Sequence, residues 1–330
     1  MSRRAGFALS TALLAAAVVT TPAHAATTIT DLGVLPSGGT HVATSVNDAG
    51  VAVGHAHSNG LPSRGVRYDG NGTATELVGP AGKSTTVEAI NSSGSAVGTA
   101  TGGVRVDTNA LRFNPDGTYA VLPVPSGYTG AIGQAISDSG TVYGVATDVT
   151  RRQVPVSWSL NGVVTTLALP AGASTAELTS ASANGYVVGN VSGPDIGSAA
   201  VRWSPDGSVT VLDALAVDFT TSAAAVNQLG EVVGAAVDAD FKSWGVRWNA
   251  DGSLNKYEQG FGPKSINDNG AVVGSTLVGS NQVPVLFERN GERIDLGFPA
   301  GVTSAGVWDI NNNGVVVGSA GGRAVKWTVG

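Results

Sequence analysis

The sequence predicts an all-β protein, a seven-bladed β-propeller of four-stranded antiparallel blades, and three observations lead to that fold class. The pattern Ala-x-x-Ile-Asn-x-x-Gly-x-Val-Val-Gly, with variants, occurs seven times at a spacing of 40 to 46 residues. Turn sequences divide each copy into four short strands, and the last copy lacks a strand that the N-terminal segment can supply. A repeat of this length and strand number is typical of a propeller blade. The first glycines of the seven copies are Gly50, Gly94, Gly140, Gly185, Gly230, Gly270 and Gly314.

A tight turn joins the first two strands of each unit. An apolar residue such as Ile90 or Ile266 precedes the sequence Asn-Asp-Ala-Gly or a relative of it. Because Asn, Asp and Gly tolerate positive φ, we expect them to form a β-hairpin turn. Paired valines such as Val187-Val188 and Val272-Val273 follow the turn, and a strand that is apolar on both faces is expected to be buried on both.

The third strand of each unit is expected to end at an aromatic residue, often preceded by Arg or Lys. These aromatic residues are Tyr68, Phe113, Trp158, Trp203, Trp248, Phe287 and Trp327. We expect the recurring cation to lie on the polar side of this strand. Turn sequences such as Asn-Pro-Asp-Gly follow, and a large residue nine positions after the aromatic marks the fourth strand.

The N-terminal segment is expected to complete the last blade. The chain ends at Gly330, too soon after Trp327 for a fourth strand. Residues 29–32 resemble the fourth strand around Leu296, and Leu32 lies 18 residues before Gly50, as Leu296 does before Gly314. Pairing of the two termini would close the ring and remove two exposed sheet edges.

Residues 1–25 have the pattern of a secretory signal peptide. Arg3 and Arg4 precede an apolar stretch, and small residues stand before a cleavage point after Ala25. We therefore expect residues 26–330 to form one extracellular domain. The twin arginines leave open whether export follows the general secretory or the twin-arginine route.

Composition limits the expected partners. Without residues 1–25 the chain has 16 basic and 24 acidic residues, a net charge of −8, which argues against nucleic acid as a partner. No later stretch is apolar enough for a membrane span. There is no cysteine, so stability must come from stacked repeats, and a monomer is expected.

The motif resembles the repeat of the HAF-repeat family of extracellular bacterial proteins. The similarity is clearest from Asp31-Leu32-Gly33 to Gly54 and covers nearly all of residues 26–330, although Val-Arg-Trp and its variants replace the family's His-Ala-Phe. The resemblance implies secretion and a β-repeat structure. It implies no activity and no catalytic residues.

Other patterns that suggest chemistry have simpler explanations. Residues 81–85 read Ala-Gly-Lys-Ser-Thr, but the first glycine of a phosphate-binding loop is missing, so no nucleotide is expected. His55 and His57 would point the same way from one strand, but no third metal ligand is marked by spacing. We therefore predict no catalytic residue, no metal and no cofactor.

One series of positions varies where its surroundings repeat. Six residues before each first glycine stand Thr44, Glu88, Gln134, Thr179, Ala224, Lys264 and Trp308. We expect this series to begin the innermost strand of each blade and to ring the channel mouth on the face of the longer connections, where repeat proteins often bind ligands. The candidate ligand-binding residues are Glu88, Gln134, Lys264, Trp308, Phe219 and Asp218.

The function predicted from these features is that of a secreted, non-catalytic binding module for an extracellular glycan, polymer or protein. The alternative is a hydrolase or lyase acting on glycans at the channel mouth, with Glu88 and either Asp218 or Asp309 as paired carboxylates. A purely structural surface protein would have no concave pocket.

Overall fold

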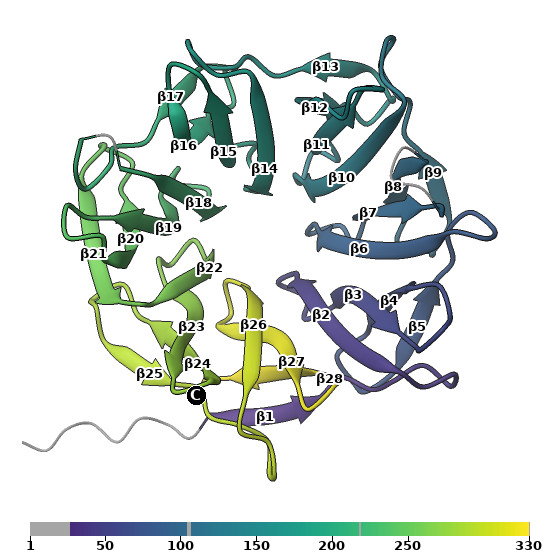
Figure 1. Cartoon of the computed structure of the whole chain (residues 1–330). Helices are drawn as coiled ribbons and strands as arrows, with labels where there is room; N and C mark the ends of the chain where they lie inside the picture. The colour runs from purple at the N-terminus through teal and green to yellow at the C-terminus, as the bar shows by residue number, and fades with distance from the viewer. Residues whose placement is uncertain (1–26, 104–106, 218, 330) are drawn as a thin grey trace, which may run out of the picture.

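The computed structural model describes residues 27–103, 107–217 and 219–329, and these residues form the predicted propeller. Seven separate sheets, each of four antiparallel strands, surround a central axis (Figure 1). The expected signal peptide lies outside the described residues. No helix among the described residues is both long and apolar enough to cross a bilayer.

Six of the seven blades run from the innermost strand to the outermost one in chain order, and the seventh takes its outermost strand from the N-terminal segment. The innermost strands are β2 (Thr40–Val46), β6 (Ser84–Ile90), β10 (Gly130–Ile136), β14 (Thr175–Ala181), β18 (Thr221–Val226), β22 (Gly262–Ile266) and β26 (Ala305–Ile310). The second strands are β3 (Ala52–His57), β7 (Ala96–Thr101), β11 (Val142–Thr147), β15 (Val187–Gly193), β19 (Val232–Val237), β23 (Val272–Val278) and β27 (Val315–Ala320).

The third strands carry the repeated aromatic residues at or near their ends, as predicted. They are β4 (Arg64–Tyr68), β8 (Thr108–Phe113), β12 (Gln153–Trp158), β16 (Gly197–Trp203), β20 (Ser243–Trp248), β24 (Asn281–Phe287) and β28 (Arg323–Thr328). The outermost strands are β5 (Ala74–Leu77), β9 (Tyr119–Val121), β13 (Val164–Thr166), β17 (Val209–Val211), β21 (Leu254–Gln259), β25 (Arg293–Asp295) and, from the N-terminal segment, β1 (Thr28–Asp31).

The predicted ring closure by the N-terminal strand is confirmed. The seventh sheet has the order β1-β28-β27-β26, with Ile29 paired to Trp327 (Figure 1). Leu32, just beyond β1, donates its backbone N–H to the carbonyl of Ala324 and is 1% exposed. The last blade is therefore built from both ends of the chain.

The hairpin turn between the first and second strands has a different conformation from the one expected. Asn47 and Asp48 do not have positive φ, whereas Gly50 does, at 78°. Gly50 donates to the carbonyl of Asn47 at 2.9 Å and Asn47 donates to the carbonyl of Val51 at 3.0 Å. This is a type I turn followed by a left-handed residue that forms a bulge, so only the glycine needs its special conformational freedom.

The core consists of clusters that cross from one blade to the next. Val53 of the first blade, for example, packs with Val87 and Phe113 of the second. Four third-strand tryptophans also donate their indole N–H to a backbone carbonyl just beyond the fourth strand of the preceding blade, and these are Trp158, Trp203, Trp248 and Trp327. The valine pairs and the aromatic residues of the repeat thus hold neighbouring blades together.

Candidate functional site

The variable series coincides with seven β-bulges. In each blade the ladder between the innermost and second strands shifts register at one residue, and that residue is in turn Thr44, Glu88, Gln134, Thr179, Ala224, Lys264 and Trp308. A bulged residue is unpaired in the ladder, bends its strand and directs its side chain differently from its neighbours. The same irregularity therefore recurs at the seven places where the residue type is free to vary.

All seven residues line one central cavity of about 260 Å³. The wall continues from each bulge to the hairpin turn that follows, for example from Thr44 to Asp48 and from Trp308 to Asn312. No described residue of the longer connections lines this cavity. The prediction that the series rings the channel mouth on the face of the longer connections is therefore wrong. The innermost strand of the first blade begins at Thr40, four residues before Thr44, so Thr44 lies farther along the strand than expected. The cavity opens toward the tight turns.

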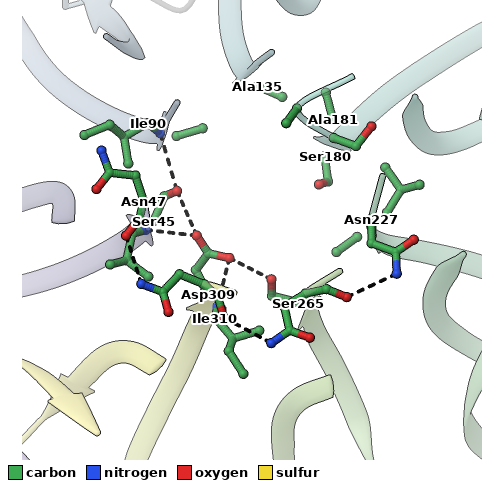
Figure 2. Close-up of a pocket in the computed structure, with 18 of the residues that line it drawn as sticks. Ser45, Asn47, Ile90, Ala135, Ser180, Ala181, Asn227, Ser265, Asp309 and Ile310 are labelled. Carbon is green, nitrogen blue, oxygen red and sulfur yellow. Dashed lines mark hydrogen bonds between the residues drawn. The ribbon is translucent and has the colours of Figure 1, made fainter. Parts of the chain in front are cut away.

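Asp309 joins three blades at the cavity wall (Figure 2). It accepts hydrogen bonds from the hydroxyls of Ser45 at 2.8 Å and Ser265 at 2.7 Å, and from the backbone N–H groups of Val46 and Ile310 at 2.9 Å each. Burial raises the pKa of Asp309 above its usual range, against the opposing effect of these donors. The sequence signal for this role was present, because small residues occupy the equivalent position in the other six units.

A belt of asparagines links the blades around the tight-turn mouth. The side-chain amide of Asn47 donates to the carbonyl of Asn91 at 3.1 Å, and that of Asn311 donates to Asn47 at 2.9 Å. Asn91, Asn227 and Asn267 make the equivalent bond to their next blade. The repeated Asn is thus a bond between blades as well as a turn residue.

The aspartates at the rim of the cavity are also occupied by the ring. Asp48 accepts from the backbone N–H and side-chain amide of Asn312 at 2.8 and 3.0 Å. Asp268 accepts from the backbone and side chain of Gln228 and from Asn312, and Asp138 accepts from Ser92. These carboxylates bind neighbouring blades, which explains their recurrence.

Two members of the variable series have unusual electrostatic surroundings. Burial raises the pKa of Glu88 above its usual range, although a hydrogen bond with the Thr86 side chain opposes the shift. The side-chain oxygen of Gln134 is buried and has no hydrogen-bond partner among the described residues. An acceptor in this state costs about 1–3 kcal/mol until a donor reaches it.

Lys264 and Trp308 form a pair from neighbouring blades. The Lys264 ammonium lies 5.1 Å from the centroid of the Trp308 ring, and the Trp308 side chain is 42% exposed. The threonines of the series differ, because Thr44 donates to the carbonyls of Val53 and Val87 and Thr179 to that of Val188. The hydroxyls of these threonines therefore bond to backbone carbonyls near the bulge.

The remaining two candidates do not join this cavity. Phe219 lies in the connection between β17 and β18 and packs edge to face against Phe241, with ring centroids 5.2 Å apart. It is not among the residues that line the central cavity. Asp218 lies outside the described residues. The structure therefore brings together Glu88, Gln134, Lys264 and Trp308 and leaves Phe219 elsewhere.

The recurring cation of the third strand binds the next blade. Arg67 and Arg202 donate to the carbonyls of Gly94 and Gly230, the turn glycines of the blade that follows.

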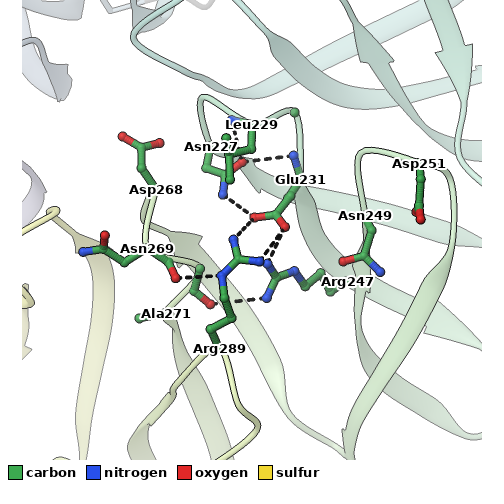
Figure 3. Close-up of polar contacts among 12 residues, drawn as sticks. Asn227, Leu229, Glu231, Arg247, Asn249, Asp251, Asp268, Asn269, Ala271 and Arg289 are labelled. Carbon is green, nitrogen blue, oxygen red and sulfur yellow. Dashed lines mark hydrogen bonds and ion pairs between the residues drawn. The ribbon is translucent and has the colours of Figure 1, made fainter.

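At one junction between blades a buried carboxylate adds an ion-pair cluster (Figure 3). Glu231 contacts Arg247 at 2.6 Å and Arg289 at 2.8 Å. Burial opposes ionisation of Glu231, but hydrogen bonds from Arg247, Asn227 and Arg289 hold its pKa below the usual range.

His55 and His57, which the sequence predicts to point the same way, lie beside each other. His55 and His57 lie edge to face with ring centroids 4.8 Å apart, and His57 Nδ1 is 2.8 Å from the Ser63 hydroxyl. No group of three or more potential metal ligands occurs among the described residues.

Comparison with known proteins identifies the fold alone. No protein-family model matches this chain, and no curated protein matches it. Virginiamycin B lyase from Staphylococcus aureus, solved with quinupristin, is 15% identical, with a TM-score of 0.58 over 92% of this chain and 99% of that chain. The β-propeller domain of the Trilobed protease from Pyrococcus furiosus is 9% identical, with a TM-score of 0.60 over 88% and 96%. TolB from Acinetobacter baumannii is 13% identical, with a TM-score of 0.52 over 85% and 64%.

Proposed function

We propose that the protein is a secreted binding module whose central cavity takes the terminal unit of an extracellular glycan. The observation that carries this proposal is the coincidence of the seven bulges with the variable series. Scaffold positions repeat from blade to blade, whereas Glu88, Gln134, Lys264 and Trp308 each present different chemistry to one cavity. A concave site with a few convergent polar groups and one aromatic surface is the usual form of a small-ligand site.

The chemistry of the wall favours a polyhydroxylated ligand. Gln134 lines the cavity and its side-chain oxygen has no partner among the described residues, so rotation of the side chain toward the cavity would let a sugar hydroxyl donate to it. The exposed ring of Trp308 offers a flat apolar surface on which the C–H face of a pyranose can lie. The cavity of about 260 Å³ is smaller than the roughly 300–1,000 Å³ of drug-sized sites, so it suits one end of a polymer better than a long segment.

A glycan-binding screen followed by titration calorimetry tests this function. Trp308→Ala should cost about 2 kcal/mol of binding free energy or more, roughly thirtyfold in affinity. Gln134→Ala should also weaken binding, whereas Lys242→Ala should not, because Lys242 lies in the exposed turn between β19 and β20. Binding that survives both cavity substitutions would place the ligand elsewhere and contradict the proposal.

A second candidate function is glycan cleavage, favoured by the raised pKa of Glu88. A carboxyl group that keeps its proton closer to neutral pH is suited to act as a general acid. Asp309, the partner acid considered from the sequence, is held by four donors, which suits it to a fixed structural role. Release of reducing ends from a bound glycan, lost in Glu88→Gln while binding persists, would establish catalysis; intact glycan after prolonged incubation would exclude it.

A further inference from the structure

The pair formed by Lys264 and Trp308 is the most distinctive part of the cavity wall. The two residues occupy equivalent bulges in the sixth and seventh blades, so both side chains face the same space. Trp308 is the only aromatic residue lining the cavity, and Lys264 is the only basic one among the described residues. The ammonium lies over one face of the indole ring, and the pair presents a cation and an apolar surface to the same cavity.

Lys264 has no carboxylate partner among the described residues. Its ammonium lies 5.1 Å from the centroid of the Trp308 ring. Asp309 lies on the neighbouring blade, but its oxygens accept from Ser45, Ser265 and two backbone N–H groups. A lysine that faces a cavity without an anionic partner is available to a ligand's anion.

The carboxylates at the rim of the cavity weaken the attraction of Lys264 for an anionic ligand but do not abolish it. Asp268 accepts three hydrogen bonds and Asp48 accepts two, all from neighbouring blades. Charges at the mouth act on a bound anion through solvent of high dielectric constant, whereas a contact with Lys264 is direct. Glu88, the acidic member of the series, lies three blades away around the ring.

We propose that the terminal unit is an acidic sugar of the uronic acid class, with its carboxylate on the Lys264 ammonium and its pyranose ring against Trp308. This inference rests on the proposed function, because it names the ligand class of the same cavity. It assigns Lys264 to charge selection and Trp308 to binding of any sugar in the site.

Matched pairs of oligosaccharides test the charge requirement. The probes are oligosaccharides that end in galacturonic, glucuronic or mannuronic acid, each paired with its carboxyl-reduced neutral counterpart, titrated into the protein at pH 7 and low salt. At least one acid should bind about tenfold more tightly than its neutral counterpart or better, as expected for one charge-assisted hydrogen bond. The difference should shrink at 0.5 M NaCl.

Variants separate this inference from the proposed function. Lys264→Gln should reduce the ratio of acid to neutral affinity to near one, Trp308→Ala should weaken both members of a pair, and the control Lys242→Gln should change neither. Equal binding of acid and neutral sugars by the wild type, or a ratio that Lys264→Gln leaves unchanged, would overturn the inference while leaving glycan binding intact. Absence of binding to every probe would overturn this inference, and absence of binding throughout the glycan screen would overturn the proposed function as well. Thermal melts of each variant establish that the fold is retained.

Discussion

At the scale of single residues, His55 occupies a place that other blades use for contacts between blades. The equivalent residues Thr99 and Asn190 accept hydrogen bonds from the backbone N–H groups of Gly133 and Ala223 on the innermost strand of the next blade. His55 Nδ1 is buried and has no partner among the described residues. Burial, and secondarily the charge of His57, lowers the pKa of His55 to about 4.

We predict that His55→Asn makes the protein less sensitive to acid. The pKa of His55 is lowered on folding, so the unfolded chain binds the proton first and stability is lost as pH falls from about 6.5 to about 4, by up to about 3 kcal/mol. Denaturant titrations between pH 7 and 4 should show a smaller loss in the variant than in the wild type. His57→Asn should recover only the smaller part of this loss that the charge of His57 contributes, and an equal loss in wild type and His55→Asn would contradict the assignment.

Arg151 is strained in the turn between β11 and β12. Its φ is 69°, and together with Phe241 it is one of two described residues other than glycine with positive φ. Both stand in equivalent turns, where Arg151 donates to the carbonyl of Asp148 at 3.0 Å and Phe241 to that of Asp238 at 3.0 Å. Most other turns of this form in the chain have glycine at this place.

We predict that Arg151→Gly stabilises the protein by about 1 kcal/mol, because relief of the left-handed conformation exceeds the added entropy of the unfolded chain. The side chain is exposed, so little packing is lost. Arg152→Gly is the adjacent control; φ of Arg152 is not positive, so that variant should lose stability. A stability loss in both variants, measured by urea unfolding, would disprove strain at Arg151.

At the scale of structural elements, the hairpin turn has two functions. Its glycine makes the left-handed bulge, and its asparagine binds both its own turn and the next blade. Asn311 accepts from the backbone N–H groups of Asn313 and Val315 and donates to the carbonyl of Asn47 at 2.9 Å. The side chain is buried, so these bonds form away from solvent.

We predict that Asn311→Ala lowers the free energy of unfolding by about 2–3 kcal/mol, because buried donors and acceptors of two blades lose their partner. Asn290→Ala is a suitable control, since Asn290 accepts from Glu292 in an exposed turn. Urea titration of both variants measures the difference. Similar losses in the two would mean that the asparagine belt contributes no more than an ordinary turn contact.

At the scale of the whole molecule, stability depends on closing the ring. β1 pairs with β28 along its full length, and the apolar residues that follow it, Leu32 and Leu35, are buried in a cluster that spans the first and last blades. The propeller domain of the Trilobed protease, by contrast, has an open Velcro topology.

We predict that deletion of residues 26–36 causes a cooperative loss of stability and solubility, because it exposes the edge of β28 and removes two buried leucines worth about 1.5–3 kcal/mol each. Deletion of residues 1–25 alone should leave the melting temperature unchanged. A chain without residues 26–36 that melts at the temperature of the full protein would show that closure is dispensable.

The sequence by itself determined the number of blades, the aromatic ends of the third strands and the use of residues 29–32 to complete the seventh blade. These features were readable because each arises from a local pattern: a repeat period, a turn composition and a run of apolar residues in one strand. Variation between the copies at one position also identified the series that contains Glu88, Gln134, Lys264 and Trp308.

Only the tertiary structure decided on which face of the propeller the cavity opens and which side chains of the variable series are available to a ligand. It also decided which groups the repeated polar residues bind. The bulge at Thr44 is a feature of pairing between two strands, and the bonds of Asp309 reach Ser45 across the closure of the ring. Phe219 lies away from the cavity because it belongs to a connection that does not follow the repeat, and the position of that connection depends on the tertiary structure. Contacts between residues 40 or more positions apart depend on how the blades pack, and a local sequence pattern does not determine that packing.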